Sequence, residues 1–246
     1  MPWITNSPSP GKEMKKLLKI ILFLAIILLN INFSYSQEVK TTEIDSLYKE
    51  DQFYAGITYN ILGNKPPKLS QTGFSMGFHF GFIKDMPINK NRNLALGLGI
   101  GYSGNTINQN LQIVKSQSNY NYTLLEDADL YTKNRFSVHL IEMPFEFRWR
   151  SSTPENYEFW IIYTGFKVGY VFANTAKYKD ALVSQTLNGI SDFNEINYGL
   201  TLCIGYNTWN FYAYYALNPI FSKSVLVDNK AIEMNAIKIG LMFYVL

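Results

Sequence analysis

Ser137, His139 and Glu142 come nearest to a catalytic arrangement in this sequence. A serine, a histidine and a carboxylate can act together as nucleophile, general base and orienting group, which would suit a hydrolase acting on lipid. Strict alternation along an extended strand, however, puts Ser137 and His139 on one face and Glu142 on the other unless a bulge intervenes. The sequence has two histidines, and neither lies in a recognised catalytic motif. We therefore assign no catalytic residue and expect no enzymatic activity.

A second group of ionisable residues falls on the small-residue faces of the strands that are expected below. Its members are Glu142, Glu146, Arg148, Lys167, Lys238 and His79. Opposite charges that are enclosed together can pair and hydrogen-bond, whereas an unpaired enclosed charge is costly. The pattern predicts a structural network of ion pairs that holds the strands in register, and the alternative is a path for ions or protons.

No cofactor or metal site is expected. Two well-separated histidines and one cysteine, Cys203, supply neither a metal-ligand cluster nor an intrachain disulfide. The glycine-rich run GLGIGYSG at 97–104 lacks the G-x-G-x-x-G spacing and opens no helix, so it does not indicate a phosphate-binding loop. Alternate glycines there more simply make room for large side chains opposite them or ease the curvature of a strand.

The elements that must position these residues are eight segments of roughly ten residues with a period of two, the length of a tilted membrane strand. They are 53–61, 73–82, 94–103, 141–149, 160–172, 198–206, 209–217 and 237–245. One face of every segment is large and apolar, while the other mixes glycine, small polar residues and the charges above. A soluble barrel or sandwich would show the reverse, with a bulky apolar face inward and a charged face outward. The pattern predicts an all-β, eight-stranded antiparallel up-and-down transmembrane barrel with lipid outside and a narrow lumen inside.

The connections between these segments alternate in length, apart from a brief first loop. The longer set is 63–71, 107–134, 174–194 and 222–232, and the shorter set is 85–92, 150–156 and 207–208. Outer-membrane barrels have long extracellular loops and short periplasmic turns, so both termini are expected in the periplasm. Tyrosines and tryptophans near segment ends suit an aromatic girdle at the membrane interfaces, namely Tyr59, Tyr102, Trp149, Trp160, Tyr206 and Trp209.

One segment breaks the alternation. Phe136, Val138 and Leu140 are apolar at even positions, whereas the apolar positions from Ile141 onward are odd. This change predicts a β-bulge, or the membrane boundary, between Leu140 and Ile141. The loop at 107–134, rich in Asn, Gln, Ser and Tyr, is the best place for specific recognition, and the alternative is a solvated loop without a partner.

The N-terminal residues read as a secretory leader. Residues 15–19 are basic, residues 20–29 are apolar but too few to span a bilayer comfortably, and Ser34 and Ser36 form a small-x-small cleavage site. We expect cleavage after Ser36, and the alternative is an uncleaved anchor.

The chain therefore divides into four parts. We expect an upstream extension at 1–13, a signal peptide at 14–36, a periplasmic tail at 37–50 and the barrel at 51–246. Either Met1 or Met14 can be the start, and Met14 is the more natural one.

Charge and composition limit the partners. Residues 1–36 hold four of the 22 Lys and Arg and one of the 19 Asp and Glu, so 18 of each sign remain and the mature chain is neutral. No basic stripe indicates a nucleic-acid partner. After residue 36 no apolar run reaches the length of a membrane helix. If the mature chain spans a membrane, it must therefore form a closed barrel, the other structure whose backbone groups are all hydrogen-bonded to one another in lipid.

Several segments resemble a known family. IEMPFEFRW at 141–149 resembles the I/L-E-x-P strand of PorT-like outer-membrane β-barrel proteins, and GFKVGYVF at 165–172 resembles the strand after it. YGLTLCIGY at 198–206 and IKIGLMFYVL at 237–246 resemble the closing strands. The resemblance implies an eight-stranded barrel in the outer membrane of a Gram-negative bacterium, and some members serve the type IX secretion and gliding apparatus.

We therefore expect a monomeric barrel in contact with outer-membrane lipid, with a structural, partner-binding or secretion-associated role and with envelope or secretion-system proteins as partners. A small porin-like channel is the first alternative and a lipid-modifying enzyme is the second. A wholly soluble periplasmic barrel is the rival fold.

Overall fold

The computed structural model describes residues 51–117, 119–126, 131–151, 160–222, 225–227 and 230–245. The upstream extension, signal peptide and tail expected at 1–13, 14–36 and 37–50 lie outside these residues. Within the described part, no helix is long and apolar enough to cross a membrane.

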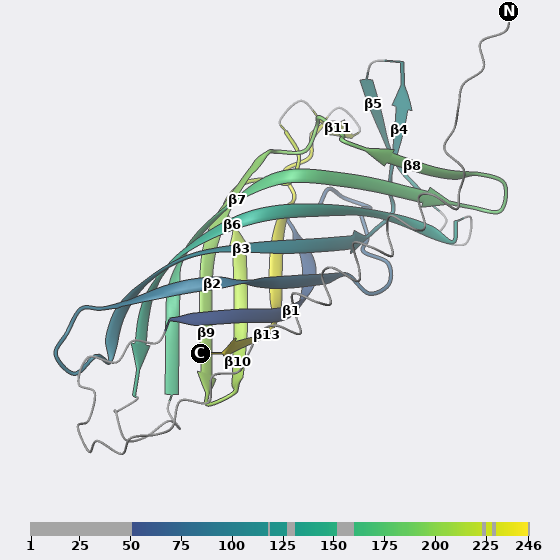
Figure 1. The fold of residues 1–246 in the computed structure, drawn as a ribbon. Coiled ribbons are helices and arrows are strands. Elements are labelled where there is room, and N and C mark those ends of the chain that lie inside the picture. Colours follow the sequence, from purple (N-terminus) through teal and green to yellow (C-terminus); the bar gives the residue numbers. More distant parts are fainter. Residues whose placement is uncertain are drawn as a thin grey trace, which may run out of the picture. The chain divides into compact units, whose positions relative to one another are not determined.

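The described residues form strands joined by turns and loops (Figure 1). The strands are β1 (Gln52–Gly63), β2 (Met76–Pro87), β3 (Leu94–Asn108), β4 (Leu111–Ser116), β5 (Asn119–Leu124), β6 (Lys133–Arg150), β7 (Trp160–Lys179), β8 (Ser184–Asn188), β9 (Ile196–Tyr206), β10 (Trp209–Ala216), β11 (Leu226–Val227), β12 (Lys230–Ala231) and β13 (Asn235–Val245). Eight of them pair in the order β1, β2, β3, β6, β7, β9, β10 and β13, and β13 pairs with β1 to close the barrel. All neighbours are antiparallel, and each of the eight predicted segments overlaps one of these strands, so the predicted fold is confirmed.

The strands are strongly tilted. Tracing paired residues from Ala95 of β3 once around the barrel leads back to Asn105 of the same strand, ten residues further along. A stagger of ten residues over eight strands corresponds to a tilt of about 40° from the barrel axis. A barrel of this size has an interior that side chains can fill, as is general for eight strands.

The two faces of the strands differ as the alternation predicts. Side chains of the large apolar face point outward and remain exposed, for example Phe80, Ile100 and Phe145. The inner face carries glycine, polar and charged side chains, most of them buried. An exposed apolar band around a polar interior is the arrangement that lipid outside the barrel favours.

The predicted irregularity is present, but its origin differs. The pairing of β6 with β7 shifts between His139 and Leu140, one bond before the predicted position. His139 pairs with Ala173 and Leu140 with Val171, so the extra residue is Phe172 of β7. Even-numbered side chains of β6 are the more buried ones on both sides of the shift. The apolar residues at even positions of β6 therefore do not mark an exchange of its inward and outward faces, and the interpretation from the sequence was wrong on this point. They mark the place where the interior of the barrel changes from polar to apolar.

That apolar interior is a hydrophobic cluster at the end of the barrel that carries the long connections. The cluster, here called the cap, consists of Leu62, Leu69, Ile107, Leu111, Ile113, Phe136, Ala176, Ile190, Phe193, Ile220, Phe221, Val225, Val227, Ile232 and Met234. The rings of Phe193 and Phe221 lie 4.5 Å apart between centroids, and Phe136 packs edge-on against both.

The predicted loop at 107–134 contributes to this cap. It begins inside β3 and then forms the β4–β5 hairpin, whose Leu111 and Ile113 are buried in the cap while Tyr122 packs against Phe221. The part of this connection nearest the barrel is therefore packed into the cap.

Candidate functional site: the barrel interior

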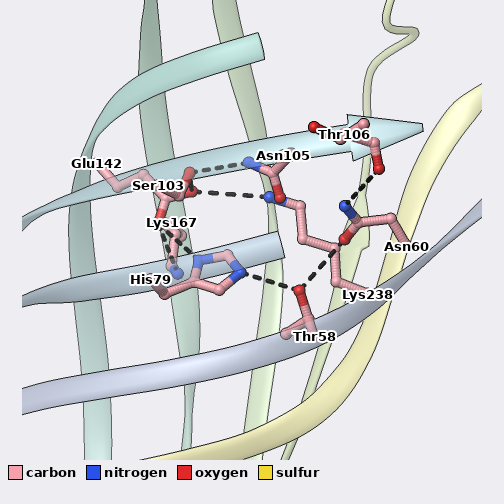
Figure 2. A network of polar contacts seen from close by, with 9 residues as sticks. All are labelled: Thr58, Asn60, His79, Ser103, Asn105, Thr106, Glu142, Lys167 and Lys238. Carbon is pink, nitrogen blue, oxygen red and sulfur yellow. Dashed lines mark hydrogen bonds and ion pairs between the residues drawn. The ribbon is translucent and has the colours of Figure 1, made fainter. Parts of the chain in front are cut away.

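Glu142, near the middle of β6, is the centre of a buried polar network (Figure 2). Ser103 Oγ donates a hydrogen bond of 2.7 Å to one carboxylate oxygen, and Lys167 Nζ donates one of 2.9 Å to the other. Lys238 Nζ lies 3.8 Å from Oε1 and His79 Nδ1 lies 3.7 Å from Oε2. These five side chains come from β6, β3, β7, β13 and β2, so one carboxylate links most of the barrel circumference.

The strand register explains why Glu142 has room for these partners. Its cross-strand neighbours are Gly101 on β3 and Gly169 on β7. A Cβ on Gly101 would overlap the hydroxyl of Tyr54, and one on Gly169 would lie 2.9 Å from Leu140. The two glycines therefore leave space on the inner face that larger side chains occupy.

Further polar contacts extend the network toward β1. His79 Nε2 lies 3.0 Å from Thr58 Oγ1, which donates to Asn60 Oδ1 at 3.2 Å. Asn105 Nδ2 donates to Ser103 Oγ at 3.0 Å, and Figure 2 shows these groups facing one another across the interior. Each of these side chains makes at least one hydrogen bond, and hydrogen bonds between buried polar groups help to hold a core in one arrangement.

A second buried cluster lies nearer the short turns. Asp85 on β2 accepts hydrogen bonds of 2.9 Å from Arg148 and from Arg150, one on each carboxylate oxygen. Arg148 also donates to Gln52 and lies 3.6 Å from Glu146. Charge-assisted bonds of this kind are the strong ones, and they bind β1, β2 and β6 together at this end.

Aromatic rings enclose the cations of both clusters. The Arg148 guanidinium lies 4.0 Å from the ring centroid of Tyr163, and Lys238 Nζ lies 5.0 Å from that of Tyr214. Cations over ring faces are attracted by the ring quadrupole, more strongly where water is excluded. The rings therefore stabilise the enclosed positive charges and also fill the lumen.

The six ionisable residues expected to form a network all lie buried inside the barrel. These are Glu142, Glu146, Arg148, Lys167, Lys238 and His79. Sequence reasoning missed Asp85 and Ser103, which pair with Arg148 and Glu142, and Arg150, which pairs with Asp85. Asp85 and Arg150 had been placed in turns, but β2 continues to Pro87 and β6 to Arg150.

The residues considered for hydrolysis are not brought together. Ser137 Oγ is hydrogen-bonded to Thr106 Oγ1 at 2.8 Å, and His139 Nδ1 to the hydroxyl of Tyr102 at 2.6 Å. Both residues lie on the opposite face of β6 from Glu142, which points inward. The shift at His139 does not change this, because the extra residue is in β7.

One element outside the barrel wall is also ordered by a carboxylate. The β7–β8 hairpin extends from the end that carries the long connections (Figure 1). At its tip the amides of Leu182 and Val183 donate to Asp180 Oδ1 at 2.7 and 2.6 Å, and the Tyr178 hydroxyl donates to Oδ2 at 2.9 Å. The amides of Val183 and Leu182 hold the pKa of the Asp180 carboxyl below its usual value. The turn presents the side chain of Leu182, which is 95% exposed.

A known family matches most of the chain. Residues 34–222 match the family described as outer membrane protein beta-barrel domain. The chain belongs to this family. Among solved structures, this outer-membrane barrel is similar to Ail, the attachment invasion locus protein of Yersinia pestis, with 11% identity and a TM-score of 0.32 over 80% of this chain and 100% of that one. No curated protein is similar enough to the chain to count as a match.

A small enclosed space lies inside this outer-membrane barrel. A cavity of about 40 Å³ lies between the Glu142 network and the cap, with Asn105 and Lys238 on its polar side and Phe136 and Ile220 on its apolar side. Since one water needs about 10–15 Å³ of such volume, the cavity can hold a few waters. The arrangement is suited to holding the strands together.

Proposed function

We propose that this chain is a non-catalytic outer-membrane barrel of the PorT-like type that binds an envelope or secretion-system protein, and that its lumen is closed to transport. The observation that carries the proposal is the filled interior. Paired charges occupy the middle and the short-turn end, and the cap covers the other end. A barrel that is filled in this way leaves recognition to the parts outside the wall.

The proposal includes an orientation. The described short turns, at 88–93 and 207–208, lie at the same end of the barrel as the start of β1 and the end of β13. Because outer-membrane barrels have short periplasmic turns and long outer loops, we place this end in the periplasm and the cap at the cell surface.

The β7–β8 hairpin is the surface that best suits a protein partner. Among the described strands β8 pairs with β7 alone, so its other edge is open. An open edge can take an extended segment of another protein as an added strand. The turn beside it holds Leu182 in a fixed exposed position, which suits an apolar anchor, since fixing a contact residue before binding reduces the entropy that binding must overcome.

The experiment is an affinity capture of the full-length protein from cross-linked envelopes of its own cell. We expect Leu182→Asp to remove a specific partner that the wild-type protein captures. Leu226→Asp is the matched control, because Leu226 is also exposed on a short strand outside the wall. Capture by Leu182→Asp at the wild-type level, or the absence of any specific partner, would contradict the proposed role.

A further inference from the structure

The outer face of the barrel carries an apolar groove across β1, β2 and β3. Its volume is about 440 Å³, and the side chains that line it on the outer face are Phe53, Phe80, Phe82, Ile100 and Tyr102. Gly81 and Gly101 pair directly across β2 and β3, and the aromatic pairs Phe53–Phe82 and Phe80–Tyr102 stand on either side. The groove is therefore a hollow between aromatic rings in a surface that faces lipid.

A charged side chain lies on the same outer face, just beyond the groove. Lys84 is exposed and follows Phe82 by two residues on β2, so the two side chains point to the same side of the sheet. On the outer face of the eight barrel strands, from the level of His79 to the short turns, every other described side chain is uncharged. Lys84 makes no ion pair with any described residue.

The depth of Lys84 follows from the strand tilt. At about 40°, each residue along a strand changes the height by about 2.5 Å. Lys84 lies five residues beyond His79 on β2, and therefore about 12 Å from the level of the Glu142 network. The apolar band of an outer-membrane barrel is about 25 Å tall, so its edge lies about 12 Å from its middle. With the Glu142 network at the middle of the apolar band, the ammonium group of Lys84 reaches the headgroup layer. The groove then runs from that layer toward the membrane centre.

We propose that the groove and Lys84 together bind one phospholipid, with an acyl chain between the aromatic rings and the phosphate on the Lys84 ammonium group. The charge is complementary to a phosphate, and the groove lies where the acyl chain of that lipid must lie. An isolated lysine on the lipid face bends its ammonium group to the interface, which is where the phosphate is found. The site depends on the membrane location of the barrel and is independent of the proposed partner at the β7–β8 hairpin.

The test is native mass spectrometry of the purified full-length barrel with added phosphatidylglycerol, phosphatidylethanolamine or diacylglycerol. We expect one retained phospholipid per wild-type barrel and at least about tenfold weaker retention in Lys84→Ala, because a charge-assisted bond to phosphate is lost. Lys84→Arg should retain the lipid. Lys90→Ala, which removes an exposed lysine from the neighbouring turn, is the matched control and should also retain it. Diacylglycerol lacks the phosphate and should show no dependence on Lys84.

A second variant tests the groove itself. Ile100→Trp fills the groove with an indole while leaving Lys84 in place, and we expect it to lose the phospholipid. Equal retention by the wild type, Lys84→Ala and Ile100→Trp would overturn the site, since it would indicate lipid carried non-specifically by the apolar band. A barrel dimer that Ile100→Trp abolishes would overturn it too, because the groove would then belong to a second copy of the chain.

Discussion

Replacing Glu142 with Gln removes the negative charge that faces two buried lysines. The nitrogen of Lys167 lies 2.9 Å from the carboxylate and that of Lys238 lies 3.8 Å from it. Glutamine has nearly the same size and can still accept the hydrogen bond of Ser103, so the change isolates the charge. Removing one partner of a buried ion pair costs about 3–5 kcal/mol, because the other charge stays enclosed without compensation.

A surface ion pair of the same chemistry provides the comparison. Lys68 and Glu126 lie 3.7 Å apart with 74% and 85% of their side chains exposed. Exposed pairs contribute about 0–1 kcal/mol. Glu126→Gln is therefore expected to lower the free energy of unfolding by at most about 1 kcal/mol. The identical substitution at Glu142 should lower it several times more.

The assay is reversible urea unfolding of the barrel in lipid vesicles, followed by tryptophan fluorescence. Adding Lys167→Gln to Glu142→Gln should recover part of the loss, because it removes one of the uncompensated charges. The reasoning would be refuted if Glu142→Gln and Glu126→Gln lowered the free energy of unfolding by the same amount. It would also fail if the double variant were less stable than the single one.

Three further changes test other parts of the structure. Gly165→Ala should lower the free energy of unfolding by about 1–3 kcal/mol, because the added Cβ would overlap the backbone carbonyl of Phe145, whereas Gly104→Ala places its Cβ against a movable side chain and should cost less. Phe136→Ala should cost about 3–5 kcal/mol in the same urea assay, since the ring is fully buried in the cap. An NMR titration of the two amides that donate to Asp180 should show a midpoint below the usual aspartate range, because these hydrogen bonds lower the pKa of the carboxyl group. The ionised carboxylate therefore stabilises the turn above the usual aspartate pKa, and this stabilisation is lost as the pH falls through the folded-state pKa. A midpoint at the usual value would contradict the hydrogen bonds.

The barrel strands could be predicted from the sequence because membrane strands obey a local rule. Outward residues that contact the lipid chains are apolar one by one, so the alternation from Phe74 to Phe82 is visible without knowledge of the neighbouring strands. The ends of the strands were harder, since the alternation fades where polar residues face both water and the lumen. Asp85 illustrates this, because it continues the inward positions of Ile83 but was assigned to the turn beside it.

The cap could not be predicted by the same rule. Ile190, Phe193 and Phe221 come from connections without a period, and the contacts between them join residues far apart in the chain. The partners of Glu142 could not be predicted either, because they depend on the register of five strands, and the alternation alone does not specify that register. The register shift was found near its predicted place, but pairing was needed to assign the extra residue to Phe172.

The proposed closure of the lumen is tested most directly by recording ionic current across a planar bilayer that contains the purified barrel. Insertion is verified separately by protection of the strands from protease. The network around Glu142, the Asp85 cluster and the cap together predict a current that stays at the baseline of the bare bilayer. Reproducible discrete conductance steps whose number rises with the amount of inserted barrel would contradict the account and favour a small channel.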